Sequence, residues 1–133
     1  MKKEFLNPKG VMSSPAFSQV ATVSGGGKTI FISGQVALDE KAELVGRGDL
    51  RAQTRKVFEN MKLALAAAGA GFDDIVKLTY FIVGYRPEHL APIREVRSEY
   101  LSKTHPPAST LIGVEALFQE DVLIEVDAIA IVE

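Results

Sequence analysis

Cysteine is absent from the 133 residues of this chain. Its absence excludes disulfide bonds, zinc–thiolate sites and thiol nucleophiles. Long apolar runs are also missing, since no segment approaches the ~20 apolar residues that cross a membrane. The basic start Met1-Lys2-Lys3 lacks the apolar stretch of a signal peptide, because Pro8 and Gly10 follow soon after it. We therefore expect a soluble, cytoplasmic protein that does not bind membranes.

An excess of positive charge is lacking as well, since the net charge is −2 at pH 7. Nucleic-acid binding would call for a basic stripe, so no nucleic-acid partner is expected. His89 and His105 have no second ligand at metal spacing, and we expect no metal site. Gly27-Lys28-Thr29 is similar to the end of a phosphate-binding loop, but Thr22 stands where that motif needs its first glycine. A plain turn is the expected structure there.

Length and composition, with 47% hydrophobic and 24% charged residues, are typical of one globular domain that spans residues 1–133. Strands are predicted at 19–23 and 29–36, where β-branched and other apolar residues gather. The glycine-rich segment 24–28 between them predicts that these two strands form a hairpin.

A helix is predicted to begin after Asp49, a suitable N-cap, and to end before the glycines at 69 and 71. Its residues at three- and four-residue spacing form one apolar stripe of Leu50, Thr54, Val57, Phe58, Met61, Leu65 and Ala68. The next strand is predicted at 75–83, with one face formed by Val76, Leu78, Tyr80 and Ile82. A second helix is predicted at 87–102, followed by strands at 109–117 and 122–132. The order β-β-α-β-α-β-β predicts an α+β fold in which two helices cover one face of a mixed sheet.

The final predicted strand carries apolar residues on both faces. One face is entirely apolar and is expected to lie under the helices. The other face combines Glu125 and Asp127 with Leu123, Ile129 and Ile131. A solvated face rarely carries three such apolar residues, and no third helix is available to cover them. A partner subunit is therefore expected on this face.

Glu125 and Asp127 are two positions apart on that strand, so their side chains point the same way. Desolvation among apolar neighbours favours the protonated form of a carboxyl group, which suits proton transfer near neutral pH. The alternative is structural, with both carboxylates paired to lysine or arginine across a subunit interface.

Two other features each have a structural and a functional interpretation. Ser33-Gly34 interrupts an apolar strand, which is typical of a bulge or of backbone amides that a ligand approaches closely. Arg94 and Arg97 lie beside the apolar stripe of the second helix, and such side chains usually keep their charged ends in water. If either turns inward toward Glu125, it becomes a candidate anchor for a carboxylate.

Several segments resemble, in order, those of the Rid/YjgF (reactive intermediate deaminase) family, and together they cover nearly the whole chain. Ala16-Phe17-Ser18-Gln19 resembles the family's Pro-Tyr-Ser-Gln segment, and Ser33-Gly34-Gln35 resembles its Ser-Gly-Gln strand. The first helix, the strand after it and the closing strands are similar too, through Gln53-Thr54, Asn60-Met61-Lys62, residues 73–79, Pro107-Ala108-Ser109 and residues 124–130.

This resemblance implies a chorismate-mutase-like fold and a homotrimer, with a central barrel of sheets and small-molecule clefts between subunits. The best-known members hydrolyse enamines and imines of the 2-iminobutanoate/2-iminopropanoate type and release ammonia, without a metal or an organic cofactor. The resemblance implies that Glu125 orients water or moves the proton. It also implies that the cleft is lined by Phe17, Ser33, Gly34, Arg94, Ser109 and Thr110.

The chain departs from the deaminating members at three of these positions. Ser109 replaces the arginine that binds the substrate carboxylate, Phe17 lacks the hydroxyl of a tyrosine, and Arg94 replaces an asparagine. Losing a charged anchor costs about 1.5–3 kcal/mol per hydrogen bond, so weak turnover of 2-aminoacrylate is expected.

Two hypotheses follow from these departures. The chain is either an imine or enamine deaminase with altered substrate preference, in which Arg94 replaces the anchor, or a non-catalytic trimer that binds a small metabolite or a protein. RNA cleavage, which has been linked to some members, is disfavoured by the acidic balance and by the lack of a suitable histidine pair.

Overall fold

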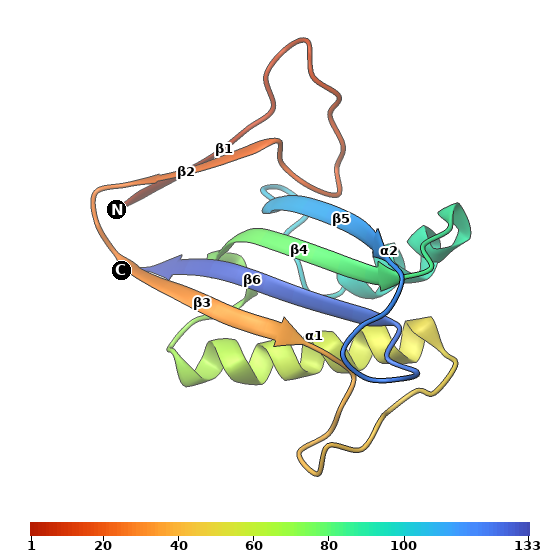
Figure 1. Ribbon diagram of the computed structural model, residues 1–133. Coiled ribbons are helices and arrows are strands. Elements are labelled where there is room, and N and C mark those ends of the chain that lie inside the picture. Colours follow the sequence, from red (N-terminus) through yellow and green to blue (C-terminus); the bar gives the residue numbers. More distant parts are fainter.

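Strand β6 (Ile124–Val132) lies at the centre of the sheet in the computed structural model, which describes residues 1–133. It pairs antiparallel with β3 (Lys28–Gln35) on one side and with β4 (Ile75–Val83) on the other. β5 (Ala108–Val114) runs parallel to β4 at the far edge. The strand order is therefore β3-β6-β4-β5 (Figure 1).

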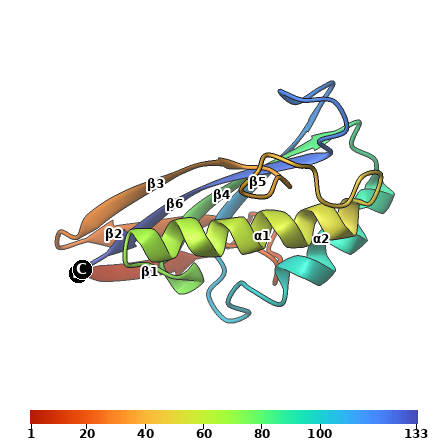
Figure 2. The same cartoon turned by 90° about the horizontal axis from the view of Figure 1, so that it is seen from below.

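Helices α1 (Leu50–Ala67) and α2 (Leu90–Arg97) lie side by side on one face of this sheet (Figure 2). Two ion pairs connect the α1 helix to the α2 segment, Arg51–Glu95 and Arg55–Glu99. The predicted α+β architecture, with two helices on one sheet face, is confirmed. Neither helix combines the length and the apolarity that a membrane crossing requires.

Helix α1 begins as predicted, because the Asp49 side chain accepts a hydrogen bond from the Ala52 amide at 3.0 Å. Its buried side carries Val57, Phe58, Met61 and Leu65 of the predicted stripe. The sequence did not reveal the role of Gln53, which is fully buried. Its amide group bonds the backbone of Gly46, Asp121 and Leu123, and so fastens the loops before α1 and β6 to the helix.

The core lies between the helices and the alternate residues of the central strands. On β6 the buried residues are Ile124, Val126, Ala128 and Ala130, as the predicted alternation requires. On β4 the prediction is correct for Leu78, Tyr80 and Ile82 but wrong for Val76. The pairing of β4 with β6 shifts register between Ile75 and Lys77. This irregularity turns Ile75 into the core and leaves Val76 only half-buried.

The N-terminal region departs most from the prediction. β1 (Lys2–Leu6) was not predicted, and β2 (Val20–Ser24) pairs antiparallel with it as a separate two-stranded sheet. The predicted hairpin of residues 19–23 with 29–36 is therefore wrong. Residues 25–27 form a linker in which all three glycines have positive φ, between 86° and 117°. This linker leads the chain away from β2 to the edge of the four-stranded sheet at which β3 begins (Figure 1).

Other predicted elements end at different residues. The second helix was predicted at 87–102, but a 3-10 turn, Pro87–His89, precedes α2, which ends at Arg97. A second 3-10 turn, Phe72–Asp74, precedes β4. β5 stops at Val114 rather than at residue 117, and β6 starts at Ile124 rather than at residue 122. Pro87 is tolerated at the start of this turn, because the amide hydrogen that proline lacks would have no partner within the helix there.

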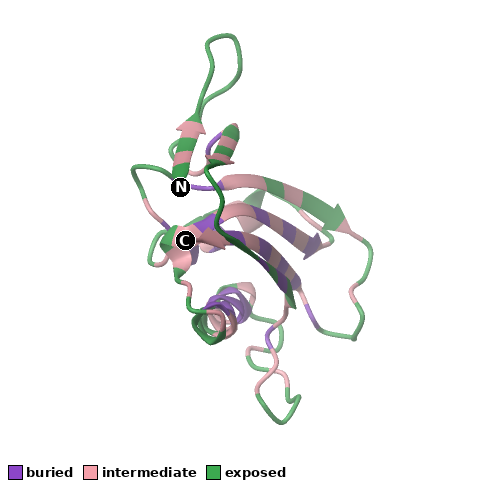
Figure 3. Ribbon diagram, turned by 90° about the vertical axis from the view of Figure 1, so that its left-hand side faces the viewer, coloured by how far each residue is buried: buried purple, intermediate pink, exposed green.

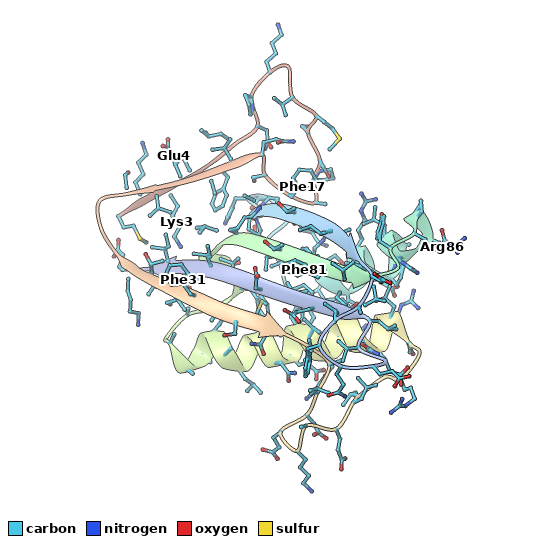
Figure 4. The ribbon with its side chains drawn as sticks, in the orientation of Figure 1. Lys3, Glu4, Phe17, Phe31, Phe81 and Arg86 are labelled. Atoms are coloured by element: carbon cyan, nitrogen blue, oxygen red, sulfur yellow. The ribbon has the colours of Figure 1, made fainter.

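The sheet face opposite the helices, here called the open face, is only partly covered in the single chain. On β6 its residues are half-buried, whereas those facing the helices are buried except for the last, Val132 (Figure 3). Phe31 of β3, which pairs with Ile129, is 77% exposed. Phe81 of β4 lies on the same face (Figure 4). Cover by a partner subunit thus stays a prediction.

Tyr80 is the one buried side chain whose polar atom has no hydrogen-bond partner. Burial raises the pKa of its hydroxyl to about 12, and the positive charge of Arg97 opposes this shift. Burial thus opposes ionisation of this hydroxyl in the folded state, so the folding stability is unaffected below about pH 10 and falls as the pH rises from 10 to 12, by at most about 3 kcal/mol.

We expect Tyr80→Phe to be as stable as the parent chain at pH 7, or about 1 kcal/mol more stable, because it removes an unpartnered buried hydroxyl. We also expect the variant to lose less stability between pH 10 and pH 12. Urea unfolding at several pH values measures both effects. Tyr100→Phe, at a half-buried ring, is the control and keeps the alkaline loss. An equal alkaline loss in Tyr80→Phe would contradict the assignment.

Candidate functional site

The carboxylate of Glu125 lies directly against the backbone of Gly34. A Cβ atom at position 34 would come within 2.1 Å of Glu125 Oε2 and 2.6 Å of its Cδ. Of the two interpretations of Ser33-Gly34, the bulge is present, because the pairing of β3 with β6 shifts register between Ile32 and Gln35. Ser33 and Gly34 lie within it, and glycine at position 34 leaves room for the carboxylate.

The surroundings of Glu125 on the open face are mixed. Its register partner is Phe81, and the next residue on the same face, Asp127, is paired with Thr79. Neither carboxylate forms an ion pair within the chain. Thr110 lies on the same face, where its hydroxyl accepts a hydrogen bond of 2.6 Å from Lys77 Nζ. The structural alternative, in which both carboxylates pair with lysine or arginine across a subunit interface, stays a prediction because it involves a second chain.

A second group of predicted residues lines a cavity of about 350 Å³ on the helix side of the sheet. Phe17, Arg94 and Ser109 all contribute to it, and its other walls are Ala16, Tyr85, Leu90, Arg97, Leu111 and Gly113. Ser109 points to this side because it is paired with the buried Leu78.

Phe17 is held in place through the residue that follows it. The Ser18 amide donates to the Pro107 carbonyl at 3.1 Å, and the Ser18 hydroxyl donates to the Pro106 carbonyl at 2.5 Å. Ser18 is buried, so these bonds fix the segment from residue 14 to residue 18 beside the start of β5. The side chain of Phe17 is thereby placed at the wall of the cavity.

The sequence predicted only part of this lining. Tyr85 was not predicted to line the cavity. It packs closely against Gly113, where an added Cβ atom would come within 3.0 Å of the Tyr85 Cβ. Arg97 was expected to keep its charged end in water, and this is wrong. It is only 8% exposed, and its guanidinium carbon lies 5.8 Å from the centroid of the Tyr80 ring. Arg94 is exposed, as the usual behaviour of a helix-surface arginine predicts.

The predicted site residues therefore fall into two groups on opposite faces of the sheet. Glu125, Ser33, Gly34 and Thr110 belong to the open face, whereas Phe17, Arg94 and Ser109 belong to the helix side. No arginine turns toward Glu125 within the chain. The geometry of one chain thus supplies a carboxylate on one surface and an apolar cavity with a cationic wall on the other.

The two histidines have local contacts. His89 Nδ1 accepts a hydrogen bond of 3.0 Å from the Arg86 amide, and the His105 ring lies 5.6 Å from the ring of Phe5. No group of three or more histidine, aspartate or glutamate side chains is placed to hold a metal ion. The histidines thus help to shape the turn before α2 and the contact between β1 and residue 105.

Comparison with known proteins gives concordant results. Residues 10–132 match the sequence model of a family described as endoribonuclease L-PSP. A Rid family protein from Yersinia pestis, of unknown function, has a crystal structure that covers 99% of this chain and 100% of its own, with a TM-score of 0.90 and 36% identity.

Two curated relatives extend this comparison. A RutC family protein of Pyrococcus horikoshii is 38% identical over 104 residues, which are 78% of this chain and 79% of that protein. A 2-iminobutanoate/2-iminopropanoate deaminase of Dermatophagoides farinae is 28% identical over 135 residues, covering 96% of this chain and 100% of that protein.

The contact between Gly34 and Glu125 predicts the effect of Gly34→Ala. The new methyl group would displace the Glu125 carboxylate, which is the far end of a flexible side chain, so we expect a loss in stability of only about 1 kcal/mol. A crystal structure of the variant is expected to show Glu125 in a different rotamer. Gly71→Ala is the matched control, because a Cβ atom there meets nothing within 4 Å. An unmoved Glu125 in Gly34→Ala would contradict the contact.

Proposed function

The chain belongs to the Rid/YjgF family, and from this premise we propose that it hydrolyses a small imine or enamine and releases ammonia. The observation that carries the proposal is the Glu125 carboxylate, which has no ion-pair partner in the chain and packs against Gly34. The similarity to a 2-iminobutanoate/2-iminopropanoate deaminase supports it.

Imine hydrolysis requires the protein to position water and substrate and to transfer protons. The carbon of a protonated C=N bond is electrophilic, so water adds to it and Glu125 accepts a proton from that water. Glu125 then returns this proton to the nitrogen of the resulting carbinolamine, the C–N bond breaks, and ammonia leaves as the hydroxyl group gives its proton to water and becomes the carbonyl. An enamine first takes a proton on carbon to give the same iminium. Holding water and substrate together supplies most of the acceleration.

Arg94 is the proposed anchor for a substrate carboxylate. It shares the cavity of about 350 Å³ with Ser109, which carries no charge, and with Phe17, which has no hydroxyl. A guanidinium binds a carboxylate through two parallel hydrogen bonds. An anchor on α2 enters the cavity from a different wall than an anchor on β5 would. The bound carboxylate would then lie in a different place, and this favours a substrate other than 2-aminoacrylate.

A homotrimer completes the proposal. Glu125 and the cavity with Arg94 lie on opposite sides of the sheet, so a site that uses both must combine two copies of the chain. Contact between two different surfaces of identical chains is heterologous, and where the rotation between neighbouring copies closes, it generates a ring such as a trimer. The apolar residues of the open face, Phe31 and Phe81 among them, would be covered in such a ring.

Glu125→Gln tests the catalytic role while keeping the shape of the side chain. We expect ammonia release to fall at least ~100-fold, because proton transfer to a positioned side chain contributes about that much. The substrates are a panel of imino acids generated in situ by an amino-acid oxidase. Glu120→Gln, at an exposed loop position, is the control and keeps full activity. Unchanged turnover in Glu125→Gln would reject the role.

The shared site predicts complementation between two inactive variants. Glu125→Gln and Arg94→Glu each disable one half of a cleft, and random mixing in hybrid trimers restores both halves in roughly a quarter of the clefts. We expect co-expressed variants to recover about that fraction of the parent activity, while each variant alone stays inactive. Recovery of no activity, with hybrid trimers verified by mass spectrometry, would place both residues in a site within one chain.

A second function is favoured by the uncharged Ser109 and the hydroxyl-free Phe17 in the cavity. In that case the protein binds a small metabolite without converting it. It would then release no ammonia from any imine of the panel, and a ligand would raise its melting temperature in a saturable manner.

A further inference from the structure

The arginines of α2 differ from every other arginine of the chain. Four of the six arginines form ion pairs, whereas Arg94 and Arg97 form none. The acidic residues of the same segment are engaged by arginines of α1, in the pairs Arg51–Glu95 and Arg55–Glu99. The side of α2 that faces away from α1 is thus left with positive charge alone.

These arginines border a second cavity, of about 410 Å³, which adjoins the first through Ala16, Arg94 and Arg97. Its lining includes a third cation, Lys103, but no aspartate or glutamate. The remaining walls are polar or small, apart from one leucine, and comprise Ser14, Pro15, Ser98, Leu101 and Ser102. Three positive side chains therefore surround a space that holds no protein carboxylate.

Arg97 makes the lack of a counter-charge costly, because it is only 8% exposed. A charge that is withdrawn from water needs a partner of opposite sign or strong hydrogen bonds. The face of the Tyr80 ring, 5.8 Å from the guanidinium carbon, supplies only a partial negative charge. A ligand anion in the cavity would supply the full charge that the chain itself does not.

Hydroxyl groups at the cavity wall are placed to assist. The Ser14 oxygen accepts a hydrogen bond of 3.1 Å from the Ala16 amide, which leaves its hydrogen available. Ser102 accepts from the Thr104 and His105 amides at 3.3 and 3.2 Å, and its oxygen also lies 3.3 Å from the Thr104 hydroxyl oxygen, so Ser14 is the hydroxyl that the chain leaves with an uncommitted hydrogen. Hydroxyl hydrogens and cationic side chains together are the donors that oxyanions bind.

We propose that this cavity binds a small oxyanion that carries two negative charges, either a phosphoryl group or a dicarboxylate. The cavity has three positive side chains and no carboxylate. A ligand with two negative charges balances this positive charge better than a ligand with one, and it leaves the site weakly positive. The proposal goes beyond imine hydrolysis and does not depend on it, because the binding is measured without turnover.

Titration calorimetry at constant ionic strength and neutral pH tests the site with inorganic phosphate, succinate and acetate. We expect phosphate or succinate to bind at least about tenfold more tightly than acetate, because each added charge-assisted hydrogen bond strengthens binding by about that factor. The tighter of the two dianions identifies the ligand as a phosphoryl or a dicarboxylate compound. Arg97→Met and Lys103→Ala are each expected to weaken this binding several-fold or more.

Arg86→Gln is the matched control, since Arg86 is exposed and paired with Glu88, and it is expected to bind like the parent chain. Lys103 is exposed, so Lys103→Ala decides the question if Arg97→Met does not fold. The proposal is overturned if neither dianion binds more tightly than acetate, or if Lys103→Ala binds both dianions as the parent does.

Discussion

The alternation of side chains along β6 is the constraint on which the rest of the structure depends. β6 is paired on both edges, so its helix-side residues must fill the core and its other residues must face the open side. Ala128 and Ala130 are buried residues of the side that faces the helices, as this alternation requires. The same alternation sets Glu125 on the open face, and the parallel pairing of β5 with β4 sets Ser109 on the other.

Local patterns in the sequence predicted the elements that are stabilised by near neighbours. Asp49 caps α1, and the stripe of that helix is buried, because both depend only on spacing along one helix. The bulge at Ser33-Gly34 could also be predicted from the sequence, because small residues that interrupt an apolar strand are a local feature. The position of Glu125 on the face opposite the core followed from strict alternation with its apolar neighbours.

What the sequence could not predict depends on contacts between distant segments. The turn-forming glycines at 25–27 suggested a hairpin, but the same positive φ values serve a linker between two sheets. The shift that buries Ile75 arises from pairing with β6. Burial of Arg97 depends on the Tyr80 ring of another strand, and the separation of the two residue groups depends on the order of the strands in the sheet.

The two ion pairs between the helical segments have a mechanical consequence. Arg51 and Arg55 are one helical turn apart, as are Glu95 and Glu99, and they are joined in the same order. A slide of α2 along α1 by one turn, about 5.4 Å, would leave an arginine and a glutamate unmatched. Each exposed pair contributes little energy, at most about 1 kcal/mol. Together they favour one axial register of α2 relative to α1. They thereby also fix where Arg94 and Arg97 of α2 lie along the sheet.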